Sequence, residues 1–464
     1  MRIETDFLGE RQLPDDVYYG VQTLRGVENF PITGIPISTV PSLVRAFGAV
    51  KKAAARTNHE LGVLDGTIAN AIVAASEAVM RGELHDQFVV DVVQGGAGTS
   101  THMNVNEVIA NKALEVMGKP KGAYDIVSPN DHVNRSQSTN DAYPTAFRIA
   151  LWHEIGALIN VMGPLRDAFA AKAVEFKDVV KMGRTHLQDA VPMTMGQEFG
   201  AYATTIDEDI QRLHEARKLV TEVNIGATAI GTSITAPVGY PQVAIRHLRE
   251  VTGIPLELSA NLVEATWDTG AYVQISGVLK RVAVKLSKIC NDLRLLSSGP
   301  RAGMNEINLP SLQPGSSIMP GKVNPVIPEV VNQVCFRVIG NDVTISFAAE
   351  AGQLQLNVME PVIAYSLFES LRIMTNACTL LREKCVTGIE SNAVRTRDMV
   401  LQTIGIVTAL TPRLGYKTCA SIAREAYDRG TSIIEIVLER GLLTQEELHE
   451  MFSPEAILDL TKVG

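Results

Sequence analysis

The chain has 464 residues and a formal net charge of −9 at pH 7, with 46% hydrophobic but only 5% aromatic residues. This length allows two or three domains with a large core, and the composition predicts aliphatic side chains from packed helices. The negative charge and the lack of a basic run argue against nucleic acid or an anionic membrane as partner. An anionic substrate would therefore need a locally positive pocket.

The cysteines and the N-terminus indicate a cellular compartment. Five cysteines, an odd number without Cys-x-x-Cys spacing, are typical of buried reduced thiols in a cytosolic protein. The first residues lack the apolar stretch of a signal peptide, and no run of about 18 apolar residues predicts a membrane span. We therefore expect a soluble, cytoplasmic protein.

The first 141 residues are predicted to form a mixed domain. Helical periodicity covers 42–61, 66–80 and 101–117, and a glycine-rich segment lies before the last of these. Three glycines within Gly95–Gly98 would bring backbone N–H groups and the Thr99 hydroxyl close to a ligand. A dinucleotide-binding fingerprint is the weaker alternative, because it needs alternating strands and helices that this chain does not show.

A polar cluster, Ser138-Thr139-Asn140-Asp141, precedes a helix predicted from about Ala142 to Lys172. One polar side chain is enough to cap a helix N-terminus. Four in succession therefore indicate a binding role in addition to a cap.

Residues 142–395 read as nearly continuous long helix. Apolar residues in 262–296 alternate spacings of four and three, which is a heptad repeat typical of a buried stripe. This stripe comprises Ile275, Leu279, Val282, Leu286, Ile289, Leu293 and Leu296. Further helices are predicted over 193–222, 326–351 and 357–388. Residues 396–464 are predicted to form a small helical domain, in which Thr444 to Glu447 have the pattern of a capping box.

The segment containing Thr185 and His186 lies between two predicted helices. Asp189 is expected to cap the second helix, with Pro192 in its first turn. A single histidine beside a turn is more often structural than catalytic, so this segment alone does not identify a site.

Gly315 to Pro325 form the loop around which the chain is organised. Gly315 and Gly321 allow tight turns around Ser316, Ser317 and Lys322. Asn324 is expected to be an N-cap and Pro325 the first helical residue. A mobile serine loop that ends at a helix N-terminus can hold an anion and carry out proton chemistry beside it.

A solvated linker and a phosphate-binding P-loop are alternative interpretations of this loop. A P-loop needs four residues between its glycine and the Gly-Lys pair, followed by Ser or Thr. Here five residues intervene and Val323 follows, so the P-loop pattern fails.

Four polar clusters thus lie at or just before predicted helix starts, where unpaired N–H groups and the helix dipole favour negative charge. They are Thr99, Ser138 to Asn140, Thr185 with His186, and the loop at 316–324. Together with Lys322 they would form a pocket for a small dianion. The sequence alone does not bring the four clusters together.

Nearly the whole chain resembles the aspartase/fumarase superfamily, on the strength of the eleven-residue serine loop and the segment 183–190. Three differences place it closer to the aspartase branch than to class II fumarases. The chain has Gly95-Gly-Ala-Gly-Thr in place of Thr-Gly-Ser-Gly-Thr, Ser138-Thr in place of Ser-Ser, and Asn324-Pro-Val-Ile in place of Asn-Pro-Thr-Gln. The openings at 6–10 and 18–23 also resemble aspartases.

The resemblance implies a mainly α, three-domain fold. Its parts would be an N-terminal mixed domain at 1–141, a central long-helix bundle at 142–395 and a small C-terminal helical domain at 396–464. The bundle is expected to form a twenty-helix core in a homotetramer, with each active site shared among three subunits. This assembly would bring the separated polar clusters together.

The resemblance also implies reversible deamination of L-aspartate to fumarate and ammonia, without metal or cofactor. Ser316 would be the base that removes a proton from Cβ and gives an enediolate intermediate. The expected β-carboxylate ligands are Thr99, Ser138, Thr139 and Ser317, the α-carboxylate ligands are Thr185, Lys322 and Asn324, and the amino-group contacts are Asn140 and His186.

Two features depart from the aspartase pattern. Residue 102 is His where aspartases commonly have Asn, and the chain ends at 458–464 without their usual basic tail. Fumarate hydratase is the alternative function, and a non-catalytic scaffold of the same superfamily is a third.

Overall fold

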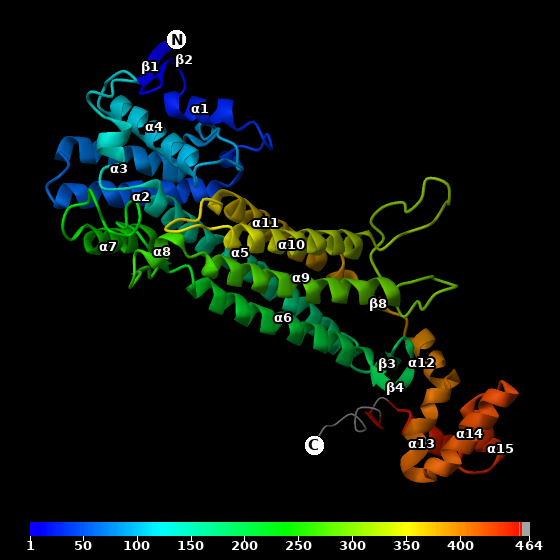
Figure 1. The fold of residues 1–464 in the computed structure, drawn as a ribbon. Helices are drawn as coiled ribbons and strands as arrows, with labels where there is room; N and C mark the ends of the chain where they lie inside the picture. The colour runs from blue at the N-terminus through cyan, green and yellow to red at the C-terminus, as the bar shows by residue number, and fades with distance from the viewer. Residues whose placement is uncertain (454, 457–464) are drawn as a thin grey trace. The chain divides into compact units, whose positions relative to one another are not determined.

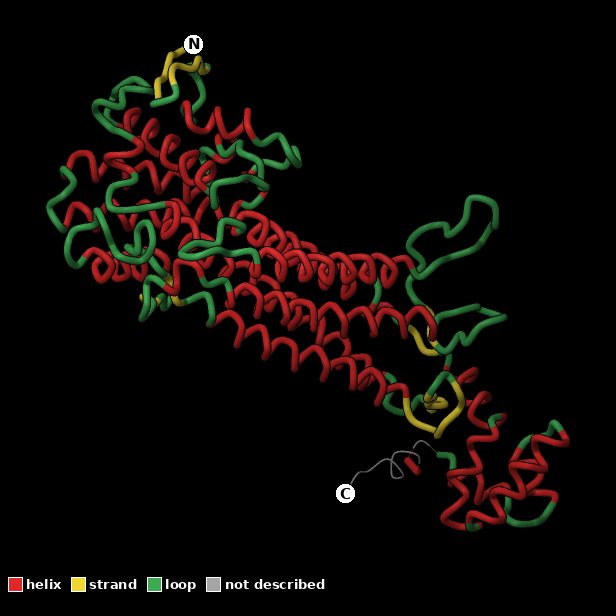
Figure 2. The backbone as a smooth tube through the Cα atoms, viewed as in Figure 1, coloured by secondary structure: helices red, strands yellow, loops and turns green. Residues whose placement is uncertain are grey.

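The computed structural model describes residues 1–453 and 455–456. The C-terminal segment 458–464, noted above for its lack of a basic tail, lies outside them. Helices dominate the described chain, with four two-stranded sheets among them (Figure 2). The mainly α prediction is therefore confirmed. None of the described helices is both long and apolar enough to cross a membrane.

The chain divides into two compact units. Unit 1 comprises residues 1–159, 211–281 and 337–374, and unit 2 comprises 160–210, 282–336 and 375–464. The five longest helices each contribute residues to both units. The three-domain division stays a prediction.

Unit 1 begins with a hairpin and a group of helices that pack on one another (Figure 1). Helix α2 contacts α3 and α7, and α3 contacts α4. The predicted helical ranges in this region agree with the observed bounds to within about two residues. The hairpin and helices of this part of unit 1 are β1 (Arg2–Asp6), β2 (Gly9–Leu13), α1 (Val21–Asn29), α2 (Pro41–Glu60), α3 (Gly66–Arg81), α4 (Thr99–Val116), α7 (Tyr240–Thr252) and α8 (Glu264–Trp267).

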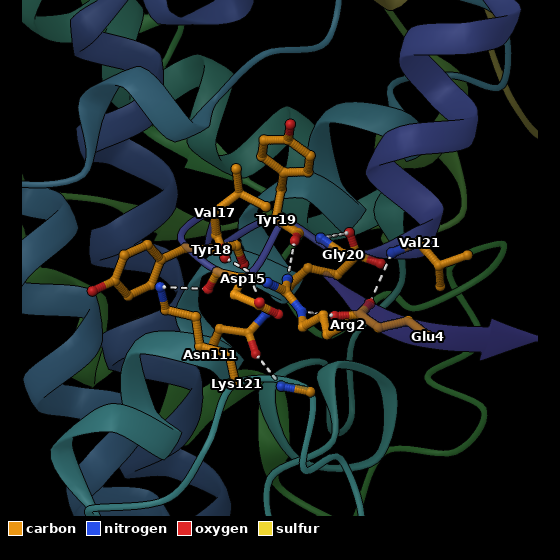
Figure 3. Close-up of polar contacts among 12 residues, drawn as sticks. Arg2, Glu4, Asp15, Val17, Tyr18, Tyr19, Gly20, Val21, Asn111 and Lys121 are labelled. Atoms are coloured by element: carbon orange, nitrogen blue, oxygen red, sulfur yellow. Dashed lines mark hydrogen bonds and ion pairs between the residues drawn. The ribbon is translucent and has the colours of Figure 1, made fainter. Parts of the chain in front are cut away.

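The N-terminal hairpin holds the segment that leads into α1 (Figure 3). The Arg2 guanidinium donates to the carbonyl oxygens of Val17 and Tyr19 at 2.8 and 2.6 Å, and its Nε donates to Glu4 at 2.7 Å. Glu4 in turn accepts from the N–H of Val21 at 2.9 Å. These contacts join strand β1 to the residues that precede and begin α1.

A buried carboxylate from α4 caps α1, because Gly20 offers no side chain to do so. Glu107 accepts from the N–H groups of Gly20, Gln22 and Thr23 at 2.8, 2.8 and 3.0 Å. Burial raises the pKa of Glu107 to about 7, while the hydrogen bonds from Thr23 and Gln22 oppose this shift.

The long helices bury their apolar stripes. All seven residues of the predicted heptad stripe are at most 4% exposed. In unit 1 the ring of Phe147 lies 4.5 Å from that of Tyr272 and 5.3 Å from that of Phe368. The long helices are α5 (Thr139–Glu175), α6 (Met195–Lys218), α9 (Gly270–Leu296), α10 (Val326–Glu350) and α11 (Glu360–Lys384).

Unit 2 ends in short helices that surround a core including Ile422, Ile436 and Leu410. The predicted capping box is confirmed, since Thr444 Oγ1 accepts from the Glu447 N–H at 3.2 Å and Glu447 accepts from the Thr444 N–H at 2.8 Å. The helices are α12 (Ala393–Gln402), α13 (Val407–Leu414), α14 (Tyr416–Arg429), α15 (Ile433–Glu439) and α16 (Gln445–Met451). The strands of unit 2 are β3 (Val180–Thr185), β4 (Gln188–Thr194), β7 (Ile307–Asn308) and β8 (Glu390–Ser391), whereas β5 (Glu222–Val223) and β6 (Glu257–Leu258) belong to unit 1.

Two predictions about helix N-termini were wrong. Asp189 does not cap α6, because it lies in β4, which pairs antiparallel with β3. Thr194 and Gln197 cap α6 instead, through reciprocal bonds of 3.2 and 3.0 Å. Helix α5 begins at Thr139 rather than near Ala142, so Ser138 precedes it and the other three residues of the polar cluster lie in its first turn.

Candidate active site

The first group of predicted site residues lies in unit 1, where Thr99 opens α4 and Thr139 opens α5. His102, one turn into α4, joins the two helix starts, because its Nδ1 lies 2.9 Å from Thr139 Oγ1. The exposed Thr99 hydroxyl donates to the Gly96 carbonyl at 2.7 Å. The His102–Thr139 contact therefore brings the start of α4, which includes Thr99, close to the start of α5.

Gly98 allows this approach of α4 and α5. Its φ is +91°, and a Cβ atom there would lie 2.4 Å from Cδ2 of Tyr143. An L side chain at this position would meet both backbone strain and a steric clash. The glycine run before α4 thus serves packing as well as exposure of its N–H groups.

A segment that the sequence analysis missed holds the start of α5. Asn140 Nδ2 donates to the Ala229 carbonyl at 2.7 Å. Asp141, which is buried, accepts from the N–H groups of Gly226 and Thr228 at 3.0 and 2.9 Å. Glycines at 226, 231 and 239 between two predicted helices are the signal that would have indicated an ordered loop here.

The second group, Thr185 and His186, lies at the β3–β4 hairpin of unit 2. Thr185 pairs with Gln188, so His186 and Leu187 form a two-residue turn with φ of +53° and +60°. This conformation favours Asn-Gly and costs free energy for larger residues. Both predicted site residues are exposed there.

A buried ionic network anchors this hairpin. Glu306 lies 2.9 Å from Lys181 and 2.5 Å from Arg184, and both of these residues belong to β3. Lys181 also lies 2.6 Å from Glu198 on α6. The side chains of Lys181 and Glu306 are 3% and 1% exposed, so each charge depends on these partners. The network fixes the residue next to Thr185.

The third group is the serine loop between α9 and α10, also in unit 2. The Gly315 N–H donates to the Lys322 carbonyl at 2.7 Å, and Asn324 Nδ2 donates to the Gly315 carbonyl at 2.7 Å. Asn324 therefore closes the loop with its side chain, and its expected role as N-cap was wrong. The helix begins at Val326, one residue after Pro325.

Ser316 has an unusual setting within this loop. Its Oγ accepts from the N–H groups of Ile318 and Met319 at 3.2 and 3.0 Å. Two donors aimed at one hydroxyl oxygen favour negative charge on that oxygen. Lys322 and Ser317 lie on the same loop, and both are exposed. This arrangement suits an anion and a proton-accepting serine.

Within the described part of unit 2, direct polar contacts do not join the second group to the third. Among the described residues, no hydrogen bond or ion pair joins Thr185 or His186 to residues 315–324. Over the same described ranges, no group of three or more His, Cys, Asp or Glu residues is placed to hold a metal ion.

Comparison with known proteins gives a consistent family. Residues 9–340 match the family model described as lyase, and residues 406–459 match that of the fumarase C C-terminus. Aspartate ammonia-lyase of Helicobacter pylori strain J99 is 58% identical over 99% of this chain and 98% of its own length. The Escherichia coli K12 enzyme of the same name is 56% identical over 99% and 96%.

Solved structures agree in fold. A fumarate lyase:delta crystallin from Brucella melitensis, solved with bound cobalt, superposes with a TM-score of 0.96 at 53% identity over 99% of this chain and 100% of that one. A class II fumarase from Schistosoma mansoni gives 0.91 at 33% identity, with 98% of each chain covered.

The buried network around Glu306 leads to a stability prediction. Glu306→Gln should lower the free energy of unfolding by about 3–5 kcal/mol, because Lys181 and Arg184 would lose their buried carboxylate. Urea unfolding followed by circular dichroism measures this loss. Asp428→Asn is the control, because it breaks the exposed Arg424–Asp428 pair and should change little. Equal effects of the two substitutions would contradict the anchoring role.

Proposed function

The chain belongs to the lyase family that contains aspartate ammonia-lyases and class II fumarases, and on this premise we propose that it deaminates L-aspartate reversibly to fumarate and ammonia. The observation that carries this assignment is the identity to aspartate ammonia-lyases along almost the whole chain, which well exceeds that to the class II fumarase. The chain is thus a carbon–nitrogen lyase.

Ser316 is the general base of this proposal. Its alkoxide, stabilised by the N–H groups of Ile318 and Met319 and by the charge of Lys322, accepts a proton from Cβ of L-aspartate. The electron pair of the C–H bond moves into the β-carboxylate and forms an enediolate. The pair then returns to form the Cα–Cβ double bond as the Cα–N bond breaks, and ammonia leaves.

The other residues bind the substrate. Helix N-termini favour the growing charge on the β-carboxylate, which is bound by Thr99, Ser138, Thr139 and Ser317. Thr185, Lys322 and Asn324 bind the α-carboxylate. His186 and Asn140 contact the amino group. The Asn140 Nδ2 already donates to the Ala229 carbonyl, which leaves Oδ1 to accept from the substrate ammonium.

The active enzyme is a homotetramer in this proposal, and each site combines residues from three subunits. Exposure of Thr185, His186, Ser317 and Lys322 on a single chain supports a shared site. The reaction uses no cofactor. The five cysteines, all buried and free, are compatible with action in the cytoplasm.

The reaction itself is the first test. Purified protein should form fumarate from L-aspartate and add ammonia to fumarate, with little fumarate from L-malate, as followed by ultraviolet absorbance. Faster turnover of L-malate would transfer the assignment to fumarate hydratase. Activity on neither substrate would support the scaffold.

The base is tested by Ser316→Ala, which should lower kcat by about 10²–10⁴ or more because the general base is lost. Exchange of the Cβ proton of aspartate with deuterium from the solvent should fall together with deamination. Ser317→Ala is the neighbouring control, and it should retain exchange of the Cβ proton, because it removes a carboxylate ligand and leaves the base in place. Continued exchange in Ser316→Ala without release of ammonia would identify another base, with His186 the next candidate.

The shared site is tested by mixing two inactive variants, Ser316→Ala and Thr185→Ala. Dissociation and reassociation of the mixture should restore part of the activity, because some sites then combine intact residues from different chains. Each variant taken alone through the same treatment is the control. A fully active monomer in sedimentation would rule out this assembly.

A further inference from the structure

A buried polar chain leads from the interior of unit 1 to the start of α5. Lys51 on α2 is 0% exposed and its Nζ lies 2.6 Å from Nε2 of His102, which is 1% exposed. His102 Nδ1 lies 2.9 Å from Thr139 Oγ1. The chain Lys51–His102–Thr139 therefore ends on a residue that the proposed function places against the substrate.

The surrounding hydrogen bonds fix which way the protons point. Lys51 Nζ lies 2.8 Å from Oε1 of Gln137 and 3.3 Å from Oδ1 of Asn134. The Gln137 amide nitrogen donates to the carbonyls of Val133 and Arg135, so its oxygen is the atom that faces Lys51. An ammonium group has three donors and no acceptor, and it meets three acceptors here.

This arrangement assigns the tautomer of His102. Because Nε2 accepts from the ammonium, the ring proton lies on Nδ1 and is donated to Thr139 Oγ1. Burial lowers the pKa of His102 well below its ordinary value, as does the nearby Lys51 charge, so the ring is neutral. Burial also lowers the pKa of Lys51, and the charge of Asp141 opposes that shift.

We propose that His102 is a positioning residue that makes Thr139 a hydrogen-bond donor to the substrate carboxylate. Since Thr139 Oγ1 accepts from the imidazole, its own O–H must donate elsewhere, and it lies in the first turn of α5 beside Ser138 and Asn140. Through His102 and Thr139, the buried charge of Lys51 polarises the hydrogen bond to the substrate carboxylate, while Lys51 itself stays buried. This inference rests on the proposed function.

The positioned Thr139 donor should raise kcat more than it lowers KM. Negative charge grows on this carboxylate as the enediolate forms, so a donor held in place stabilises the transition state more than bound L-aspartate. Hydrogen bonds in such chains also polarise one another. Phe47, stacked on the imidazole at a ring distance of 6.0 Å, restricts the ring plane.

Two amide substitutions separate the roles of the ring nitrogens. His102→Asn places an amide N–H close to the position of Nδ1 and retains a donor to Thr139. His102→Gln places its amide close to Nε2, so it retains the Lys51 contact but loses that donor. His102→Gln should lower kcat at least about tenfold with little change in KM, because Thr139 loses the donor that directs its O–H to the substrate carboxylate. The decrease in kcat caused by His102→Asn should be severalfold smaller than that caused by His102→Gln.

Further measurements exclude a merely structural effect. His102→Gln should have no additional effect on kcat in a Thr139→Val background, since both substitutions remove the same donor. His247→Gln on α7 is the control for loss of a mostly buried histidine, and it should not affect kcat. Equal losses from the Gln and Asn variants, or full additivity with Thr139→Val, would overturn the proposal.

The tautomer provides a readout independent of the reaction. In protein labelled with ¹⁵N-histidine, the His102 signal is assigned by its disappearance in His102→Asn. Nδ1 should give the resonance of a protonated nitrogen and Nε2 that of an unprotonated one. The reverse assignment would overturn the proposal even in an active enzyme. Wild-type protein without activity on L-aspartate, but with the expected tautomer, would instead count against the proposed function.

Discussion

The cost of burying a charge without partners is the constraint on which the candidate site depends. Lys51, Asp141 and Glu306 are almost completely buried, and each is satisfied by groups far away in the sequence. Asp141 holds the loop at 226–228, Lys51 holds His102 and Gln137, and Glu306 holds β3. An unpaired charge at any of these positions would cost several kcal/mol, so the partner segments have little freedom.

The proposed site explains how a negatively charged protein could bind a dianion, because it combines backbone dipoles with side-chain charge. The predicted β-carboxylate ligands Thr99 and Thr139 open the helices α4 and α5, where N–H groups lack helical partners. In the serine loop, two further N–H groups point at Ser316 Oγ. Local fields of this kind do not depend on the net charge of −9.

Several site segments combine rigidity with exposure. The His186–Leu187 turn has left-handed backbone at two non-glycine residues, and the adjacent ion pairs keep it in place. The serine loop is closed at its base by Gly315, Lys322 and Asn324, while Ile318 at its tip is 84% exposed. A closed base with an exposed tip suits a loop that moves over a ligand, as expected for proton abstraction away from water.

The sequence by itself determined the long helices, the capping box at Thr444 and the stripe from Ile275 to Leu296, because these depend on residues at most a few positions apart. The serine-loop motif and its resemblance also predicted the family. Tertiary structure alone decided that Gln188–Thr194 is a strand and that Asn324 closes a loop. It also decided that Lys51 meets His102, 51 residues away. Such pairings depend on which distant groups meet in the folded chain, and no local pattern records them.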